Sequence, residues 1–225
     1  MGSMLLLALD TSLAACSVAL WRDDGLLAHR FEPMARGHAE ALVPMILAVC
    51  ADAGADLSQV DALAVTRGPG TFTGIRIGLA TARGLALTNA CPVVGVSTLE
   101  AIGVGAALPP GRDPLLVVQD ARRGAVYAEL LDAAAAPLAG PRIVDLPGLE
   151  VAFPGRPLRL VGSGAHLAAE RLGAGVTVAR GEILPDAAIV AAIAVARLKT
   201  HGATAYARPP SPLYLRAPDA KLPAL

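Results

Sequence analysis

Short, uninterrupted hydrophobic runs open the chain and predict three consecutive β-strands. The first run, residues 5–9, ends at Asp10-Thr11-Ser12, the second covers residues 16–21, and the third covers residues 26–31 after a short polar turn. Apolar runs of this length bounded by turn residues are typical of buried strands. We therefore predict a meander in which tight turns join three neighbouring strands.

From Gly37 onward the hydrophobic period becomes that of a helix, with two apolar stripes side by side. A helix that is apolar on two sides needs two neighbours. Pro44 lies inside the pattern, so the regular helix either starts there or kinks there. The first stripe is Leu42, Ile46, Val49 and Ala53, and the second is Val43, Leu47 and Cys50.

The remaining pattern predicts alternating strands and helices, then a second set of paired strands that allows a duplicated fold. Pro109-Pro110-Gly111 marks the expected boundary between lobes at 4–108 and 109–225, and residues 1–3 are interpreted as an expression scar. Residues 137–157 are expected to be rich in turns. The predicted strands are 62–66, 93–96, 115–119, 125–131 and 158–162, the predicted helices are 73–89, 98–107, 166–172 and 185–200, and an extended tail covers 208–212.

Composition excludes several classes of protein. The 225 residues are 54% hydrophobic and 17% charged, and 19 basic residues balance 19 acidic ones, so neither a disordered chain nor a free-standing nucleic-acid binder is expected. The three cysteines, Cys16, Cys50 and Cys91, have no CxxC spacing and predict neither disulfides nor a zinc site. No hydrophobic run is long enough to cross a membrane. These features predict a cytoplasmic protein.

The turn after the first strand, Asp10-Thr11-Ser12, is a candidate nucleotide site. In sugar-kinase and actin-like folds, a hairpin with an acidic residue at the strand end approaches nucleotide phosphates and their metal. Asp and Thr also cap turns by bonding to nearby backbone groups in proteins of every kind. Both interpretations remain open from the sequence.

A glycine-rich segment at residues 67–78, RGPGTFTGIRIG, links a strand to a helix. The backbone at Gly68 and Gly70 and the helix start at Thr73 could hold an anion. The alternative is mechanical: Thr73 caps the helix, while Gly74 and Gly78 let another helix come close. The segment has neither the P-loop nor the GxGxxG spacing.

Few other side chains suggest chemistry. Arg76 and Arg83 share one helix face and would either pair with acids of a partner or remain solvated. The polar segment 120–127 is a hairpin loop or the wall of a cleft that Tyr127 lines. His38 has no second ligand at helical spacing and is interpreted as a cap or a satisfied polar group. No serine stands in a GxSxG elbow.

Five segments resemble the TsaB (YeaZ) family, of which GPGTFTGIRIG is the most specific. The resemblance is nearly continuous over the first 130 residues and thin from there to the tail. The segments are MLLLALDTSLAACSVALW at 4–21, residues 60–84, VGVSTLE at 94–100, DARRGAVY at 120–127 and PLYLR at 212–216.

The resemblance implies a two-lobed α/β fold of the actin-like and ribonuclease H-like (ASKHA) superfamily, with a mixed sheet and flanking helices in each lobe. It also implies a platform subunit needed to place the N6-threonylcarbamoyl group (t6A) on adenosine 37 of tRNAs that read codons beginning with A. The implied partners are a catalytic TsaD-like subunit and a TsaE-like ATPase, with tRNA bound only through the complex. TsaC supplies the threonylcarbamoyl-adenylate.

The resemblance further implies that this chain is not the catalyst. The catalytic relative carries His-x-x-x-His at places that fall here at Thr98 and Ile102, and isoleucine cannot ligate a metal. Glu100, between them, is left without a catalytic task. We expect no catalytic residue, no metal and no required cofactor, and we leave open whether ATP or ADP binds.

Family members pair through the first two helices of the N-terminal lobe, as a homodimer when alone and with TsaD in the complex. Ile46→Asp or Leu47→Asp is accordingly expected to abolish association while the monomer stays folded. The candidate residues for core and interface are Leu42, Val43, Ile46, Leu47, Cys50, Ile75, Arg76, Gly78, Leu79, Ala82 and Arg83.

Two rival functions remain. The first is a nucleotide-binding enzyme of the same fold, either a small-molecule kinase or a glycoprotease-like hydrolase, for which residues 161–164, VGSG, are only a weak adenosine-binding turn. The second is a homodimeric scaffold that binds no nucleotide.

Overall fold

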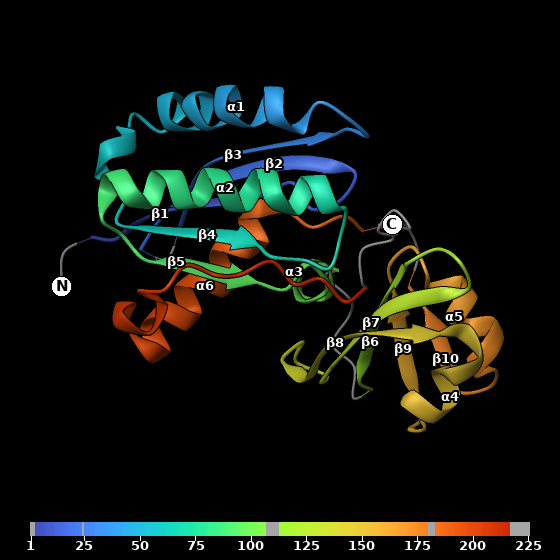
Figure 1. Ribbon diagram of the computed structural model, residues 1–225. Helices are drawn as coiled ribbons and strands as arrows, with labels where there is room; N and C mark the ends of the chain where they lie inside the picture. Colours follow the sequence, from blue (N-terminus) through green and yellow to red (C-terminus); the bar gives the residue numbers. More distant parts are fainter. Residues whose placement is uncertain (1–2, 24, 107–112, 180–182, 217–225) are drawn as a thin grey trace, which may run out of the picture.

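The computed structural model of this chain describes residues 3–23, 25–106, 113–179 and 183–216. These residues form two lobes, each built on a five-stranded mixed β-sheet with helices packed against it (Figure 1). The prediction of a two-lobed, actin-like α/β fold is confirmed. Within the described ranges, no helix combines the length and the apolar character needed to cross a membrane.

The first sheet contains five strands from the first half of the chain. They are β1 (Leu5–Asp10), β2 (Ala15–Arg22), β3 (Gly25–Pro33), β4 (Ala62–Thr66) and β5 (Val93–Val96). The order is β3-β2-β1-β4-β5, with an antiparallel meander followed by two parallel strands. Every residue of β1 and β4 is buried, which explains why both are continuous hydrophobic runs.

The second sheet repeats this strand order. Its strands are β6 (Leu115–Asp120), β7 (Ala125–Leu131), β8 (Pro137–Asp145), β9 (Leu158–Val161) and β10 (Val176–Val178). The order β8-β7-β6-β9-β10 again joins an antiparallel meander to two parallel strands. The paired strands at the start of each half thus belong to a duplicated topology.

Helices cover both faces of each sheet. They are α1 (His38–Asp52), α2 (Phe72–Asn89), α3 (Thr98–Gly105), α4 (Leu149–Ala152), α5 (Ala165–Leu172) and α6 (Ala187–His201), with 3-10 turns η1 (Leu57–Gln59), η2 (Leu146–Gly148) and η3 (Ala203–Tyr206). In the first lobe, α1 and α2 cover one face and α6 covers the other (Figure 1). In the second lobe, α4 and α5 cover one face and α3 covers the other.

One helix from each half of the sequence packs on the sheet formed by the other half, which corrects the predicted domain division. The final helix α6 was assigned to the second lobe, but its buried face, including Val190 and Ala194, packs on the first sheet. Conversely, α3 packs through Leu99 and Ile102 on the second sheet. The correction has a physical reason: an apolar sheet face is covered by whichever helix the topology brings to it. The expected boundary at 109–111 lies outside the described residues.

Three local expectations also change. Residues 137–157 contain the edge strand β8. The prolines and the glycine within it are typical of turns, so the sequence did not predict a strand there. The helix α1 passes through Pro44, so a start at Pro44 is wrong. The cap of α2 is Thr71 instead of Thr73, because the Thr71 Oγ1 accepts the Gly74 N–H at 3.1 Å.

Residues 208–216, here called the C-terminal strap, contain no regular element and run from the first lobe to the second (Figure 1). The Pro210 carbonyl accepts a hydrogen bond from Arg83 at 2.6 Å. The Leu213 N–H donates to the Arg67 carbonyl at 2.7 Å. The expected extended tail is confirmed, and it lies along α2 and β5.

Candidate functional site

The strand-end turn, residues 10–12, lies at the end of β1, and its acidic residue is fully buried. The Oδ1 of Asp10 accepts hydrogen bonds from the Ser12 N–H (3.2 Å), the Ser12 Oγ (2.7 Å) and the Thr66 Oγ1 (2.5 Å). Because Thr66 ends β4, one carboxylate oxygen joins the ends of two neighbouring strands. The side chain therefore has a structural role in the sheet.

The ionisation of Asp10 is controlled by its burial. Burial raises the pKa of Asp10 to about 6, although the hydrogen bonds from Ser12 and Thr66 act in the opposite direction. Its Oδ2 has no hydrogen-bond partner in the described part of the chain. At pH 7 a carboxyl group with this pKa is still mostly ionised.

The glycine-rich segment packs directly onto this strand-end turn. A Cβ at Gly74 would lie 2.0 Å from the Thr11 carbonyl oxygen, and one at Gly70 would lie 2.4 Å from the Ser12 carbonyl oxygen. The Thr71 N–H donates to the Ser12 carbonyl at 2.8 Å, and the Thr11 Oγ1 donates to the Gly74 carbonyl at 2.7 Å. The glycines thus permit two backbone segments to touch.

The candidate nucleotide residues are consequently occupied by contacts within the chain. Asp10, Thr11 and Gly68 are buried and Gly70 is half-buried, whereas Thr73 is exposed on the first turn of α2. Gly68 has a φ of 109°, in the left-handed region that favours glycine. Of the two interpretations that the sequence left open, this geometry favours tight packing over phosphate binding.

The two apolar stripes of α1 have different environments. Leu42, Ile46 and Val49 are at most 2% exposed and pack on the first sheet. Val43 and Leu47 are 51% and 56% exposed. We call this pair the outer α1 surface. One neighbour of the helix is therefore the sheet, and the second stripe has an uncovered apolar surface.

Most other candidate interface residues lie in the core of the first lobe. Because Ile46 is 2% exposed, Ile46→Asp would place a charge in that core, which corrects the expectation that such a variant stays folded. The interface candidates that lie on the surface are Val43, Leu47, Arg76 and Arg83. Those in the core are Leu42, Ile46, Cys50, Ile75, Gly78, Leu79 and Ala82.

Arg76 and Arg83 both face the C-terminal strap, so their shared helix face is occupied within the chain. The Arg76 Nε donates to the Tyr214 hydroxyl at 2.9 Å, and its guanidinium lies 3.6 Å from the centre of the Phe72 ring. Phe72 and Tyr214 also stack, with 5.3 Å between ring centres. Arg83 holds the Pro210 carbonyl. Both arginines are exposed, and each also has a hydrogen-bond partner in the strap.

Buried charged groups connect α3, α6 and β7 at the junction of the lobes. Arg197 binds both carboxylate oxygens of Glu100 at 2.7 and 2.6 Å and the Gly95 carbonyl at 2.9 Å. Beside this pair, Glu129 accepts a hydrogen bond from the Ser97 Oγ at 2.5 Å, and burial raises the pKa of Glu129 to about 7. Glu100 thus has a structural task, which the sequence did not reveal.

The remaining candidates have structural partners. The Nε2 of His38 lies 2.9 Å from the Leu13 carbonyl, so this histidine is a satisfied polar group, as interpreted. Thr98 and Ile102 are buried on α3. Among the described residues, no group of three or more His, Cys, Asp or Glu side chains is placed to hold a metal ion. That the chain needs no metal stays a prediction.

The polar segment 120–127 is a hairpin loop that receives the C-terminal strap. The Asp120 Oδ1 accepts the Arg122 N–H at 2.7 Å, and Arg216 donates to the Ala121 carbonyl at 2.7 Å. Tyr127 is partly buried against the core between α3 and the second sheet. The sequence predicted an extended tail over 208–212 but not its continuation to this loop through Arg216, although the PLYLR segment was part of the resemblance.

Comparisons with known proteins agree with the fold. The family model described as TsaD, tRNA N6-adenosine threonylcarbamoyltransferase, matches residues 31–158. The tRNA threonylcarbamoyladenosine biosynthesis protein TsaB of Escherichia coli is 46% identical over 124 residues, which are 55% of this chain and 53% of that protein. TsaB of Haemophilus influenzae is 43% identical over 127 residues, which are 56% of this chain and 53% of that protein. The chain therefore spans about half the length of these curated relatives that it matches.

Other similar proteins match over nearly their whole length. An uncharacterized protein of Mycobacterium tuberculosis is 37% identical over 218 residues, which cover 96% of this chain and 93% of the relative. The solved structure of YeaZ from Pseudomonas aeruginosa is 30% identical and superposes with a TM-score of 0.80, covering 94% of this chain and 100% of that one.

Proposed function

Because this chain belongs to the TsaB (YeaZ) family, we propose that it is a non-catalytic platform subunit of t6A biosynthesis on tRNA. In this proposal, it binds a TsaD-like catalytic subunit, and the pair recruits a TsaE-like ATPase. The tRNA is held by the complex, and this chain, with no net charge, contributes little to phosphate binding.

The observation that carries the proposal is the outer α1 surface. Val43 and Leu47 are large aliphatic side chains, each more than half exposed, on a helix whose other stripe is fully packed. Burying such exposed area under a partner contributes on the order of 1 kcal/mol for each side chain. A partner helix lying against α1 would bury both at once, since they are one helical turn apart.

The same surface supports pairing of two copies when the catalytic subunit is absent. In a symmetric contact the outer α1 surface of one copy packs against the same surface of the second copy, because a twofold interface uses one patch twice. Homodimer and heterodimer then compete for one surface. Titrating the TsaD-like subunit into the homodimer and following the mass by light scattering tests this competition.

The rival kinase or hydrolase requires a nucleotide at the strand-end turn. The close contact of Gly74 with Thr11, and the hydrogen bonds that the Asp10 Oδ1 accepts from Ser12 and Thr66, argue against that use. Glu100 is held by Arg197 and is not free to act as a base. Calorimetric titration of the isolated chain with ATP and ADP separates the functions, since saturable binding together with turnover would support the rival.

Reconstitution tests the proposed function itself. Homologues of TsaC, TsaD and TsaE are combined with tRNA, threonine, bicarbonate and ATP, and modified adenosine is measured with and without this chain. We expect modification to require it. Modification that proceeds normally in its absence would refute the platform role.

A further inference from the structure

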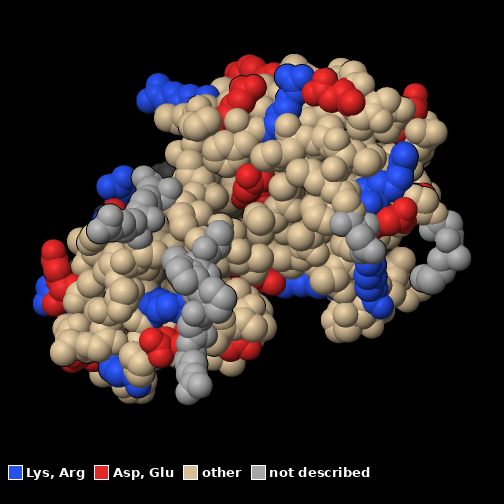
Figure 2. Space-filling model, turned by 180° about the vertical axis from the view of Figure 1, so that it is seen from behind, with Lys and Arg blue, Asp and Glu red and all other residues tan. Residues whose placement is uncertain are grey.

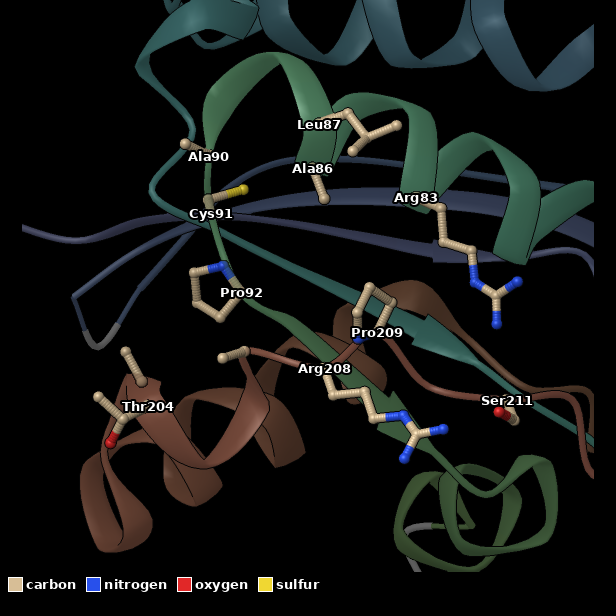
Figure 3. A pocket seen from close by; sticks show the side chains of 12 residues that line it. Arg83, Ala86, Leu87, Ala90, Cys91, Pro92, Thr204, Arg208, Pro209 and Ser211 are labelled. Carbon is tan, nitrogen blue, oxygen red and sulfur yellow. The ribbon is translucent and has the colours of Figure 1, made fainter.

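A groove separates the C-terminal half of α2 from the segment that joins η3 to the C-terminal strap (Figure 3). Its volume is about 820 Å³. The walls are apolar, and Figure 3 shows the Cys91 sulfur beside Ala86 and above Pro92. Its lining includes Ala86, Leu87, Cys91, Pro92, Ala207 and Pro209.

Leu87 is the most conspicuous side chain of this groove. It is 85% exposed, although it is a large aliphatic residue on a helix whose opposite side is packed in the core. Burial raises the pKa of the Cys91 thiol, so this part of the lining stays uncharged at neutral pH. The groove therefore offers a largely apolar floor to a side chain that enters it.

The charged side chains that line the groove, Arg83 and Arg208, are both basic. The acidic Asp61 lies outside the lining but near enough to raise the pKa of Cys91. The chain has no Asp or Glu between Asp61 and Glu100 or between Asp186 and Asp219. Arg83 donates one hydrogen bond to the Pro210 carbonyl, which leaves further N–H groups of its guanidinium. On the opposite side of the molecule, by contrast, acidic and basic side chains are interspersed on a mostly uncharged surface (Figure 2).

An apolar floor between two guanidinium groups fits a peptide better than a nucleic acid. Single-stranded nucleic acids are bound by stacking of bases on aromatic side chains, and the described lining of this groove contains no aromatic residue. Carboxylates, in contrast, pair with arginine in a bidentate geometry while aliphatic side chains fill apolar grooves.

We propose that this groove docks an acidic, aliphatic segment of a partner protein. An aliphatic side chain of that segment packs on Leu87, and flanking carboxylates pair with Arg83 and Arg208. From Arg83 to Ala90 the helix advances about 10 Å, which matches about three residues of an extended peptide. The groove does not include the outer α1 surface, so the two docking sites can be tested separately.

Selection from a random peptide library displayed on phage tests the proposal on the full chain. Winning peptides are synthesised with a fluorescent label, and their dissociation constants are measured by anisotropy. Leu87→Ser removes the aliphatic contact, and Arg208→Glu reverses the charge. The matched controls are Val151→Ser, at an 86% exposed aliphatic residue of the second lobe, and Arg171→Glu, at an exposed arginine of α5. Circular dichroism checks that all four variants are folded.

We expect the selected peptides to combine Asp or Glu with Leu, Ile or Val. Each groove variant should weaken binding at least about tenfold, the two controls should leave it unchanged, and added salt should weaken it further. Selected peptides without acidic residues, or peptides that bind the groove variants as well as the parent, would overturn the proposal. It is likewise overturned if only a labelled 12-nucleotide RNA probe binds and Arg208→Glu abolishes that binding.

Discussion

The strand-end turn and the outer α1 surface differ in whether their side chains already have partners within the chain. The turn carries the polar residues that suggest chemistry, yet Asp10 and Thr11 are buried and bonded to neighbouring parts of the chain. The outer α1 surface carries no reactive group, yet half of Val43 and of Leu47 remains exposed. In this protein, exposed apolar area is therefore a better guide to the functional surface than the presence of reactive side chains. This favours a subunit that binds partners.

The largest expected effect is on the contact between the two backbone segments of the turn. Gly74→Ala places a Cβ 2.0 Å from the Thr11 carbonyl, so backbone must move, and we expect the free energy of unfolding to fall by about 4 kcal/mol or more. Urea denaturation measures it. Gly84→Ala, in the same helix with open space around it, is the control and should stabilise by about 0.5–1 kcal/mol. Similar effects at both glycines would refute the packing role.

Adjacent residues of α1 should respond very differently to truncation. Ile46→Ala leaves a cavity in the core and is expected to cost about 3.5 kcal/mol of unfolding free energy. Leu47→Ala should change it by less than about 0.5 kcal/mol, because the side chain is exposed. Thermal and urea unfolding of both variants provide the measurement. Equal costs would mean that the outer stripe is already covered in the monomer.

The buried carboxyl group predicts a particular pH dependence. Because the pKa of Asp10 rises from 3.8 to about 6 on folding, the folded state binds the proton more tightly than the unfolded chain. Stability from this group is thus greatest below pH 3.8 and is lost as pH rises through 6, by about 3 kcal/mol in total. The free energy of unfolding of the parent, relative to that of Asp10→Asn, should therefore fall as pH is raised from 4 to 8. A difference that grows in the parent's favour with rising pH would contradict it.

A smaller loss of stability than for Ile46→Ala is expected at the C-terminal strap. Arg216→Ala removes hydrogen bonds to the Ala121 and Arg122 carbonyls, and we expect a loss of about 1 kcal/mol. Hydrogen exchange should rise in the strap and around residues 121–124 while the core of each sheet stays protected. Unchanged exchange in the strap would show that Arg216 does not hold it on the second lobe.

Local patterns predicted much of the fold. The meander, the strands at 62–66 and 93–96 and both stripes of α1 follow from periodicity alone. Which stripe faces solvent does not, since that depends on a sheet whose strands lie far away in the sequence. The same holds for α6, which covers a sheet formed more than 90 residues earlier, and for β8, whose pairing with β7 overrides its prolines.

The candidate site was predictable only in part. The glycine-rich segment stood out in the sequence, and its packing role was one of two interpretations. Burial of Asp10 and the ion pair of Glu100 with Arg197 depend on contacts between distant residues. The sequence did place charged residues, such as Glu129 and Arg197, within an otherwise apolar strand and helix. Such a position predicts that the charge is paired inside the protein.

The most direct test of the platform role is reconstituted t6A formation with Leu47→Asp. The charge would be desolvated under the partner, so we expect affinity for the TsaD-like subunit to fall about 100-fold and modified adenosine to fall with it, while the variant unfolds like the parent. Val151→Asp, at a more exposed aliphatic residue of the second lobe, should support full modification. Full modification and unchanged affinity with Leu47→Asp would contradict the account.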